Sequence, residues 1–318
     1  MFLQLLFSTR LKTVACAIGL DVGGTKIAAG LVTPDGKVIT RRVIPTLPRR
    51  GGEAVLEDAL SLAASLREES KAAGRSVVAV GVAVCELVDL RGNITSDQTI
   101  PWRGLPVQER FSELAPAVVE ADSRAAAFCQ ARFGAGRNHR IFLYLTVGTG
   151  IGSSLVLEGV PYTGARGSSG TLASSPLSTR CTECGAELGP VLEQIASGPG
   201  LVTHYNQLTA KRVEKAEQVL AAAAAGDRDA AQVVRTAGEA LGATVGLMIN
   251  MLDPEAVVVG GGLGMAGGLY WEGFIASTRG HIWSDTHRDL PIVTAAYGSD
   301  AGFVGAAALA LRRYAAPP

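Results

Sequence analysis

The sequence predicts an α/β fold with two lobes, and three observations support this prediction. The chain has 318 residues, which is long for a single hydrophobic core, and 47% of them are hydrophobic. Apolar β-forming runs alternate along the chain with runs of helical spacing, a pattern typical of α/β proteins. Two glycine-rich turns, at residues 23–25 and 148–150, each lie between a pair of apolar runs, so each lobe would contain one of them.

The first glycine turn predicts a β-hairpin. Apolar residues 14–20 lead into Gly23-Gly24, and a second apolar run, residues 27–32, follows at once. A P-loop needs G-x-x-x-x-G-K-[ST] at the start of a helix, and a Rossmann turn also needs a helix after its glycines. Neither pattern occurs here, so both nucleotide-binding loops are excluded.

Polar groups at this turn suit a phosphate with its magnesium ion. The glycines leave backbone N–H groups free to face an anion, and Thr25 and Lys26 add a hydroxyl and a positive charge. Asp21, at the end of the first strand, could orient a hydrated Mg²⁺. The alternative is an ordinary Gly-Gly turn that binds nothing.

A second stretch repeats the pattern. Residues 144–156 again form a strand, a glycine turn and a strand, with Gly148, Thr149 and Gly150 in the turn. The repeat indicates a duplicated β-β unit, one in each lobe. Two glycine hairpins that hold phosphates between them resemble those of the actin-like ATPase (ribonuclease H-like) fold, whose active site lies in the cleft between the lobes.

The chain resembles the ROK family of sugar kinases and repressors over nearly everything after residue 14. Six pieces in the family's order carry the resemblance: Asp21–Lys26, Gly148–Gly152, Tyr162–Gly167, Ile195–Gly198, Val258–Gly262 and Asp300–Ala306. It implies a glucokinase-like enzyme that transfers the γ-phosphoryl group of ATP to a sugar hydroxyl. The alternative is a regulatory or sugar-sensing protein that binds nucleotide but has little kinase activity. A repressor is not expected, because a DNA-binding domain has no room before the first hairpin.

The resemblance assigns roles to matching residues. Residues 23–26 and 148–150 would hold the phosphates of ATP, and Gly261 and Gly262 would let the backbone approach adenosine, although a strand-to-helix turn would also explain these two glycines. The family's Glu-Asn-Asp-Ala-Asn segment corresponds to residues 120–124, which makes Asp122 the general base. Transfer to an alcohol needs such a carboxylate, because the proton leaves as the O–P bond forms. An Asp here would equally suit a helix N-cap, so both readings stay open.

On the sugar-binding side, the sequence departs from the family. Three residues that contact sugar in the family, an Asn, a Glu and a His, are replaced by Ala121, Thr171 and Ser174, and Asp97 or Gln98 replaces another Asn. Glu193 is the sugar-contacting acid that remains, although an exposed glutamate on a helix face is an equally good reading. We therefore expect glucose to be a poor substrate.

The structural zinc site of the family is also incomplete. Only Cys181 and Cys184 remain of its four ligands, and two thiolates form half of a tetrahedral site. We therefore expect that the protein binds no structural zinc. The alternative is a zinc ion whose remaining ligands come from distant residues, and a disulfide between the two cysteines is a less favoured one.

Composition limits the partners and the location. The 29 Lys and Arg balance the 29 Asp and Glu, so nothing indicates binding to nucleic acid or to a membrane surface. The five cysteines have irregular spacing and no run of about 18 apolar residues occurs, which favours a cytoplasmic chain. The resemblance implies a homodimer or higher oligomer.

The resemblance and the pattern of runs also predict the lobes. The first would comprise residues 14–121 and 300–318, with the C-terminal helix packed back on it, and the second residues 122–299. Helices are predicted in the second lobe at 188–196, 213–225 and 228–251.

Overall fold

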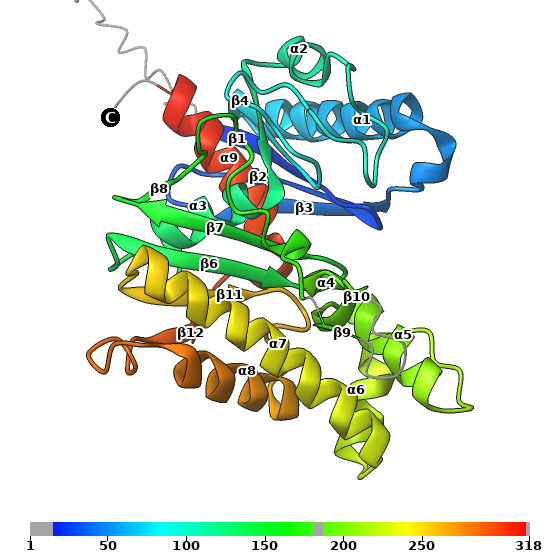
Figure 1. The fold of residues 1–318 in the computed structure, drawn as a ribbon. Coiled ribbons are helices and arrows are strands. Elements are labelled where there is room, and N and C mark those ends of the chain that lie inside the picture. The colour runs from blue at the N-terminus through cyan, green and yellow to red at the C-terminus, as the bar shows by residue number, and fades with distance from the viewer. Residues whose placement is uncertain (1–14, 178, 181–186, 316–318) are drawn as a thin grey trace, which may run out of the picture.

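The computed structural model describes residues 15–177, 179–180 and 187–315, which contain two five-stranded sheets (Figure 1). The first sheet has the order β3 (Val38–Pro45), β2 (Lys26–Val32), β1 (Ala15–Val22), β4 (Ser76–Val84) and β5 (Ala117–Ala121). The second has the order β12 (Ile292–Thr294), β11 (Ala256–Gly260), β6 (Ile141–Val147), β7 (Ile151–Leu157) and β8 (Val160–Pro161).

The two sheets have the same connectivity. In each, a glycine hairpin forms the antiparallel pair, β1 with β2 and β6 with β7, and a third antiparallel strand follows at the edge. Two parallel strands continue the other side, β4 and β5 in the first sheet and β11 and β12 in the second. The prediction of a duplicated unit built on two hairpins is confirmed.

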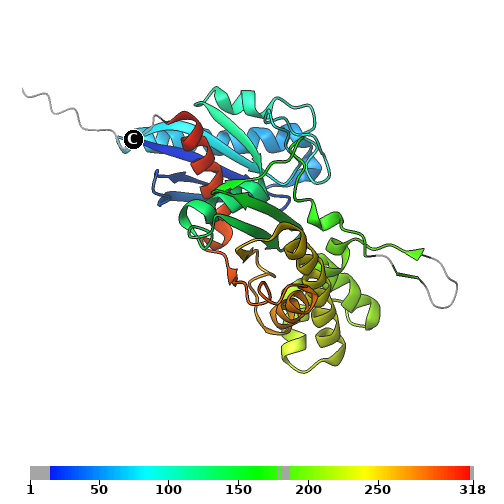
Figure 2. The ribbon, with the colours of Figure 1, turned by 60° about the vertical axis from the view of Figure 1, so that its left-hand side comes forward.

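Helices cover both sheets and separate them. Helix α1 (Gly52–Ala72) packs on the outer face of the first sheet, and α7 (Arg228–Leu252) and α8 (Gly268–His281) pack on that of the second (Figure 1). Helices α3 (Asp122–Phe133) and α9 (Ala301–Tyr314) lie between the sheets, as a second view of the ribbon also shows (Figure 2).

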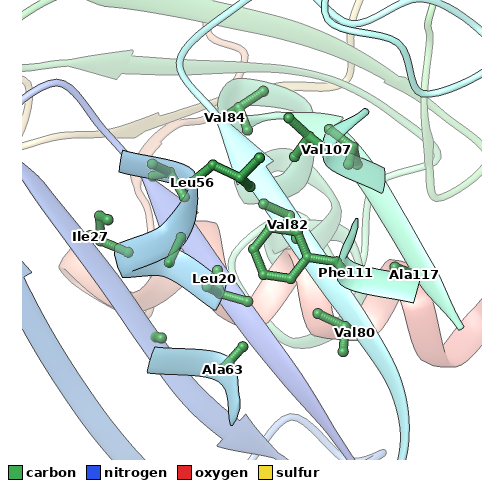
Figure 3. Packing of buried hydrophobic residues seen from close by; sticks show 14 of the residues in the cluster. Leu20, Ile27, Leu56, Ala63, Val80, Val82, Val84, Val107, Phe111 and Ala117 are labelled. Carbon is green, nitrogen blue, oxygen red and sulfur yellow. The ribbon is translucent and has the colours of Figure 1, made fainter. Parts of the chain in front are cut away.

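The alternation of side chains along each strand gives the molecule three cores. In β1, Ile18 and Leu20 face α1, in the core drawn in Figure 3, whereas Ala17 faces the helices between the sheets. In β6, Leu143 faces α7 while Phe142 faces the helices between the sheets. Each such fully buried large side chain stabilises the fold by roughly 1.5–3 kcal/mol.

The C-terminal helix α9 packs against β1 and β4 of the first sheet. A Cβ atom on Gly19 of β1 would lie 1.9 Å from the carbonyl oxygen of Phe303 in α9. Only glycine therefore permits the helix to approach the middle strand so closely, and this contact joins the end of the chain to its beginning.

Several elements of the second half differ from the prediction. The predicted helix at 188–196 forms only from Leu192 as α4 (Leu192–Ala196), because Gly189-Pro190 precedes it and proline cannot donate a backbone hydrogen bond. Three helices were not predicted: α2 (Val107–Ser112), α5 (Gly198–Leu208) and α8. For α5 and α8 the reason is that glycines at or near the start of the helix are typical of loops. The remaining elements are η1 (Pro48–Arg50), η2 (Leu172–Ser174), β9 (Thr179–Arg180), β10 (Glu187–Leu188), α6 (Ala216–Ala224) and η3 (Gly298–Asp300).

Across the described part of the chain, none of the helices is both long enough and apolar enough to span a bilayer.

Candidate active site

The turn of the first hairpin is fixed by a neighbouring loop. The N–H of Gly23 donates to the carbonyl of Lys26 at 3.1 Å, which closes the turn. Thr46 holds it from outside: its hydroxyl donates to the Gly23 carbonyl at 2.6 Å, and its N–H donates to the Thr25 carbonyl at 3.1 Å. The side chains of Thr25 and Lys26 are exposed, so both remain accessible to a ligand.

The turn of the second hairpin gathers two further segments. The N–H of Gly148 donates to the Gly150 carbonyl at 2.9 Å, and the Gly148 carbonyl accepts the N–H of Gly198, at the head of α5, at 2.8 Å. The Val147 carbonyl accepts the N–H of Leu263 at 3.0 Å, which holds the glycine triplet that follows β11.

The triplet glycines have different surroundings. Gly261 has a φ of +82°, and a Cβ atom on it would lie 2.3 Å from the Val147 carbonyl oxygen, so the backbone itself requires glycine there. A Cβ on Gly262 would meet no atom within 4 Å. Open space therefore lies beside Gly262. At Gly261 the turn after the strand is enough to require glycine, as the alternative interpretation of the sequence had it.

Two half-buried carboxylates with raised pKa values lie between the hairpins. Burial, and then the charge of Asp122, raise the pKa of Asp21 to about 7, against the opposing charge of Lys26. Burial also raises the pKa of Asp122 to about 6, while the N–H of Ser123 and the charge of Arg124 oppose this shift. A carboxylate with a pKa near 6 can accept a proton at neutral pH and release it again.

The position of Asp122 favours a role other than capping. It is the first residue of α3, and the N-cap position is occupied by Ala121. The Asp122 carboxylate accepts only the adjacent N–H of Ser123, at 2.5 Å, and makes no capping bond to the first turn of the helix. Ser123 in turn faces the second hairpin, because a Cβ on Gly152 of β7 would lie 3.0 Å from the Ser123 Cβ. The head of α3 therefore lies between Asp21 and the second hairpin.

Helix α9 supports Asp21 from below. A Cβ on Gly302, in the first turn of α9, would lie 2.3 Å from Oδ2 of Asp21. The carboxylate thus rests directly on the backbone of this helix, near its positive N-terminal end. Sequence reasoning assigned Gly302 to the family resemblance and gave it no role at Asp21.

A buried glutamate organises the loop above the first hairpin. Glu86, 4% exposed, accepts the N–H groups of Gln98, Thr99 and Ile100 at 3.0, 2.7 and 2.9 Å, and it also accepts the hydroxyl of Ser96. Thr99 then lies against the first turn, since a Cβ on Gly24 would lie 2.5 Å from its methyl group. The sequence signal was a charged residue at the end of the apolar run of β4.

The predicted sugar-binding residues are only partly brought together. Oε2 of Glu193 accepts the N–H of Ile151 at 2.8 Å, which attaches α4 to the second hairpin. Asp97 is exposed and forms an ion pair of 3.2 Å with Arg103, while Gln98 contributes its backbone to the Glu86 loop. Thr171 and Ser174 lie at η2 and are exposed. The roles of Asp97, Gln98 and Glu193 in sugar binding stay predictions.

Cys181 and Cys184, the two remaining ligands of the expected zinc site, lie outside the described residues. Within residues 15–177, 179–180 and 187–315, no group of three or more His, Cys, Asp or Glu side chains is arranged to hold a metal ion.

Two sheets of identical strand order, each with a glycine hairpin beside the carboxylates, define a protein of the actin-like ATPase fold. The model of the ROK family matches residues 17–313, and the chain belongs to this family.

Known relatives and structures agree with this assignment. The chain is 31% identical to the glucokinase of Streptomyces coelicolor, over 92% of this chain and 96% of that protein. It is 30% identical to the N-acetylmannosamine kinase of Escherichia coli O7:K1, over 92% of this chain and 97% of that protein. A ROK family glucokinase from Streptomyces griseus, solved in complex with glucose and AMPPNP, has a TM-score of 0.80 and 29% identity, and the match covers 93% of this chain and 99% of that one.

Proposed function

We propose that the protein is an ATP-dependent sugar kinase that transfers the γ-phosphoryl group of ATP to a sugar hydroxyl. The observation that carries this proposal is the pair of carboxylates with raised pKa values, Asp21 and Asp122, beside two glycine hairpin turns. The kinase names of the relatives, and the nucleotide analogue and glucose bound to the Streptomyces griseus enzyme, support it.

Phosphate binding would depend on the two turns. The N–H groups of Gly23 and Gly148 close the turns, so the anion would be bound by the backbone N–H groups of residues 24–25 and 149–150, and Lys26 adds a positive charge at the first turn. Both turns are held by neighbouring segments, so their geometry is set before ATP arrives. The open space beside Gly262 supports its predicted place near adenosine.

Asp122 would act as the general base. At neutral pH a carboxyl group with a pKa of about 6 is mostly ionised, so it can accept the proton of the attacking hydroxyl. Burial, and to a smaller extent the negative charge of Glu86, disfavour the ionised form of Asp122, which makes its carboxylate a stronger base than that of an exposed aspartate.

The carboxylates also fit a magnesium ion. Mg²⁺ prefers oxygen ligands, and Asp21 offers a half-buried carboxylate whose pKa is raised by burial and then by the negative charge of Asp122. Asp21 would hold the hydrated ion, which when bound offsets negative charge on the phosphates. The positive charge of Lys26 and the close packing of the Asp21 carboxylate against the backbone of Gly302 would keep this carboxylate in place.

The replaced sugar-binding residues support the alternative of a nucleotide-binding regulator with little kinase activity. Ala121, Thr171 and Ser174 each lack a partner that glucose-phosphorylating relatives are expected to use. An unpaired buried polar group costs roughly 1–3 kcal/mol, so glucose should bind poorly while another hexose, such as N-acetylmannosamine, could be preferred. Coupled ATP turnover with glucose, mannose and N-acetylmannosamine, compared with turnover in water alone, separates the two functions.

The variant Gly148→Val tests the role of the hairpins. A Cβ atom at Gly148 meets only the N of Gly262, at 3.9 Å, so the fold should survive while the bulky side chain excludes phosphate. We expect nucleotide binding to disappear in calorimetry. Gly280→Val is the control, because a Cβ there meets no atom within 4 Å and the residue lies in α8. Unchanged ATP affinity in Gly148→Val would contradict the two-hairpin site.

We also propose that the protein forms a homodimer or higher oligomer. Leu247 and Met251 of α7 and the nearby Trp283 are 57%, 73% and 88% exposed, and Asn250 attaches the Trp283 segment to α7 through the Trp283 N–H at 2.9 Å. Apolar side chains exposed together support an interface at this place. Sedimentation velocity tests the proposal: the variant Trp283→Glu should sediment as a monomer. The control variant Leu90→Glu, at another exposed apolar residue, should sediment like the wild type.

A further inference from the structure

We propose that Arg124 is a positioning residue for the sugar side of the site: it ties one loop from each sheet to the head of the helix that carries Asp122. The inference rests on the proposed function, and it concerns a position where the matching family segment has Asn. Arg124 lies two residues after Asp122 and is only 2% exposed.

The guanidinium group of Arg124 joins two loops that are far apart in the sequence. Its Nη1 donates to the carbonyl of Gly167, in the loop after β8, at 2.7 Å. Its Nη2 donates to the carbonyl of Val88, in the loop after β4, at 3.0 Å. The first loop belongs to the second sheet and the second loop to the first sheet, so one side chain connects both halves of the molecule.

Glu120 neutralises and orients this guanidinium. Nε of Arg124 donates to Oε1 of Glu120 at 2.6 Å, and Nη2 lies 2.5 Å from the same oxygen. The two residues are four apart in the sequence, Glu120 in β5 and Arg124 in α3, and the pair is nearly buried, with the Arg124 side chain 3% and the Glu120 side chain 18% exposed. A buried pair of this kind adds little net stability but fixes geometry, and removal of one partner leaves a buried charge unpaired.

The two loops also touch each other at this point. Gly167 has a φ of +82°, and a Cβ on it would lie 2.2 Å from the Val88 carbonyl oxygen. The backbones are therefore in contact, and the guanidinium sits beside the contact with a bond to each carbonyl. Val88, Glu120, Arg124 and Gly167 form this junction, which has no space for a side chain at Gly167.

Each loop leads from the junction to a part of the site. Leu87 accepts the N–H of Thr95 at 2.8 Å, which continues the first loop into the segment that Glu86 holds above Gly24. The second loop continues to Gly170, whose carbonyl accepts the hydroxyl of Ser153 at 2.9 Å, and then to the predicted sugar-side Thr171. Arg124 thus fixes the sugar side before sugar binds.

Arginine is the residue that this geometry requires. Its planar group offers five donors in a fixed fork, which serve a carboxylate and two carbonyls together. Lysine keeps the charge but concentrates its donors on one atom, and glutamine loses the charge. Arg124→Lys and Arg124→Gln therefore separate the two contributions.

The charge of Arg124 also acts on Asp122, whose pKa it lowers. The other ionisable groups around this carboxylate are Asp21, Cys85, Glu86 and Tyr144. These groups are unchanged in the variants, so a shift of the acid limb of the pH profile reports on Arg124 alone.

The test compares kinetics of Arg124→Lys, Arg124→Gln and the control Arg110→Gln, which removes an exposed arginine paired with Glu53 and Glu57. We expect both Arg124 variants to raise the sugar KM at least about tenfold, the equivalent of 1.4 kcal/mol, with the ATP KM unchanged. Only Arg124→Gln should move the acid limb of kcat/KM to higher pH. Equal rises in both KM values, or a fall in kcat with an unchanged sugar KM, would overturn the proposal.

Amide hydrogen exchange tests the junction without any activity. Arg124→Gln should accelerate exchange at residues 87–95 and 163–172 together and leave exchange in the first hairpin unchanged. If Arg124→Gln does not fold, Glu120→Gln replaces it in this experiment and should accelerate exchange in the same two segments more weakly. Unchanged exchange in both loops contradicts the positioning role. If the wild-type protein phosphorylates no sugar, the proposed function fails, and the exchange result still decides the role of Arg124.

Discussion

At the scale of residues, the proposed chemistry depends on two carboxylates, Asp21 and Asp122, whose pKa values are both raised. Burial is the larger cause for both, so each carboxyl keeps its proton to a higher pH than an exposed aspartate would. Asp122 lies at the head of a helix without capping it, which leaves its oxygens available to a substrate.

We predict that Asp122→Asn loses about 10²–10⁴-fold in sugar-dependent turnover and keeps its ATP affinity, because only the proton acceptor is removed. The base works when ionised, so wild-type kcat/KM should fall as the pH drops below about 6, the pKa of Asp122. Turnover measured between pH 5 and 8 checks both expectations. Asp35→Asn, an exposed aspartate in a turn, is the control. Persistent turnover with a lower melting temperature would indicate a structural role instead.

The same carboxylates predict how stability depends on pH in the absence of ligands. Because the pKa of Asp21 is about 7 in the folded state and 3.8 is its ordinary value, the folded chain binds more protons between these values. The free energy of unfolding should therefore fall as the pH rises from about 4 to 7. Asp21→Asn should lose this part of the pH dependence, measured by urea unfolding at several pH values. An identical pH dependence in the variant would show that the group titrates normally.

At the scale of elements, α9 is the support on which the first hairpin's carboxylate rests. It crosses both β1 and β4 between the sheets, and its first turn has glycine where any side chain would meet Asp21. This helix comes from the end of the chain, about 280 residues after the strand that it supports.

We predict that Gly302→Ala lowers turnover with a smaller effect on stability, because a Cβ atom 2.3 Å from Oδ2 must displace the Asp21 carboxylate. Gly280→Ala in α8 is the matched control: its Cβ meets nothing within 4 Å, and alanine in a helix should stabilise by about 0.5–1 kcal/mol. Initial rates at saturating ATP, together with thermal unfolding, measure the two effects. Normal rates in Gly302→Ala would mean that Asp21 adapts to the added methyl group.

At the scale of the whole molecule, the core between the sheets joins the two halves. Side chains of both sheets pack there on α3 and α9, with Phe303 fully buried at its centre and its ring also against Gly30 of β2. Residues from the start, the middle and the end of the chain therefore depend on one another for burial.

We predict that Phe303→Ala destabilises the protein by about 3–5 kcal/mol and accelerates amide exchange in both sheets, because the cavity opens in their shared core. Phe111→Ala, in the core of the first sheet and α1, should cost a similar amount but affect the first sheet most in exchange measured under native conditions. If Phe303→Ala loosened the first sheet alone, the core would not couple the two halves.

The sequence by itself determined the two hairpins, the duplicated topology and the family, because these depend on local patterns of glycine, apolar residues and spacing. It also proposed Asp21 and Asp122 as site residues, although it left the capping role of Asp122 open, and their roles stay predictions. Of the three helices it missed, α5 and α8 have glycines at or near their start, where a helix and a loop look alike in sequence.

The tertiary structure alone decided what holds the site. Glu86, Arg124 and Gly302 act on groups that are 10 to 281 residues away, so no local pattern could have indicated their partners. Burial of Glu86 and Arg124 also contradicts the usual expectation for charged residues, and it is possible only because backbone groups from separate loops satisfy their hydrogen bonds. The local pattern of apolar residues and glycines determines which helices and strands form. Long-range packing decides which side chains those elements bring together.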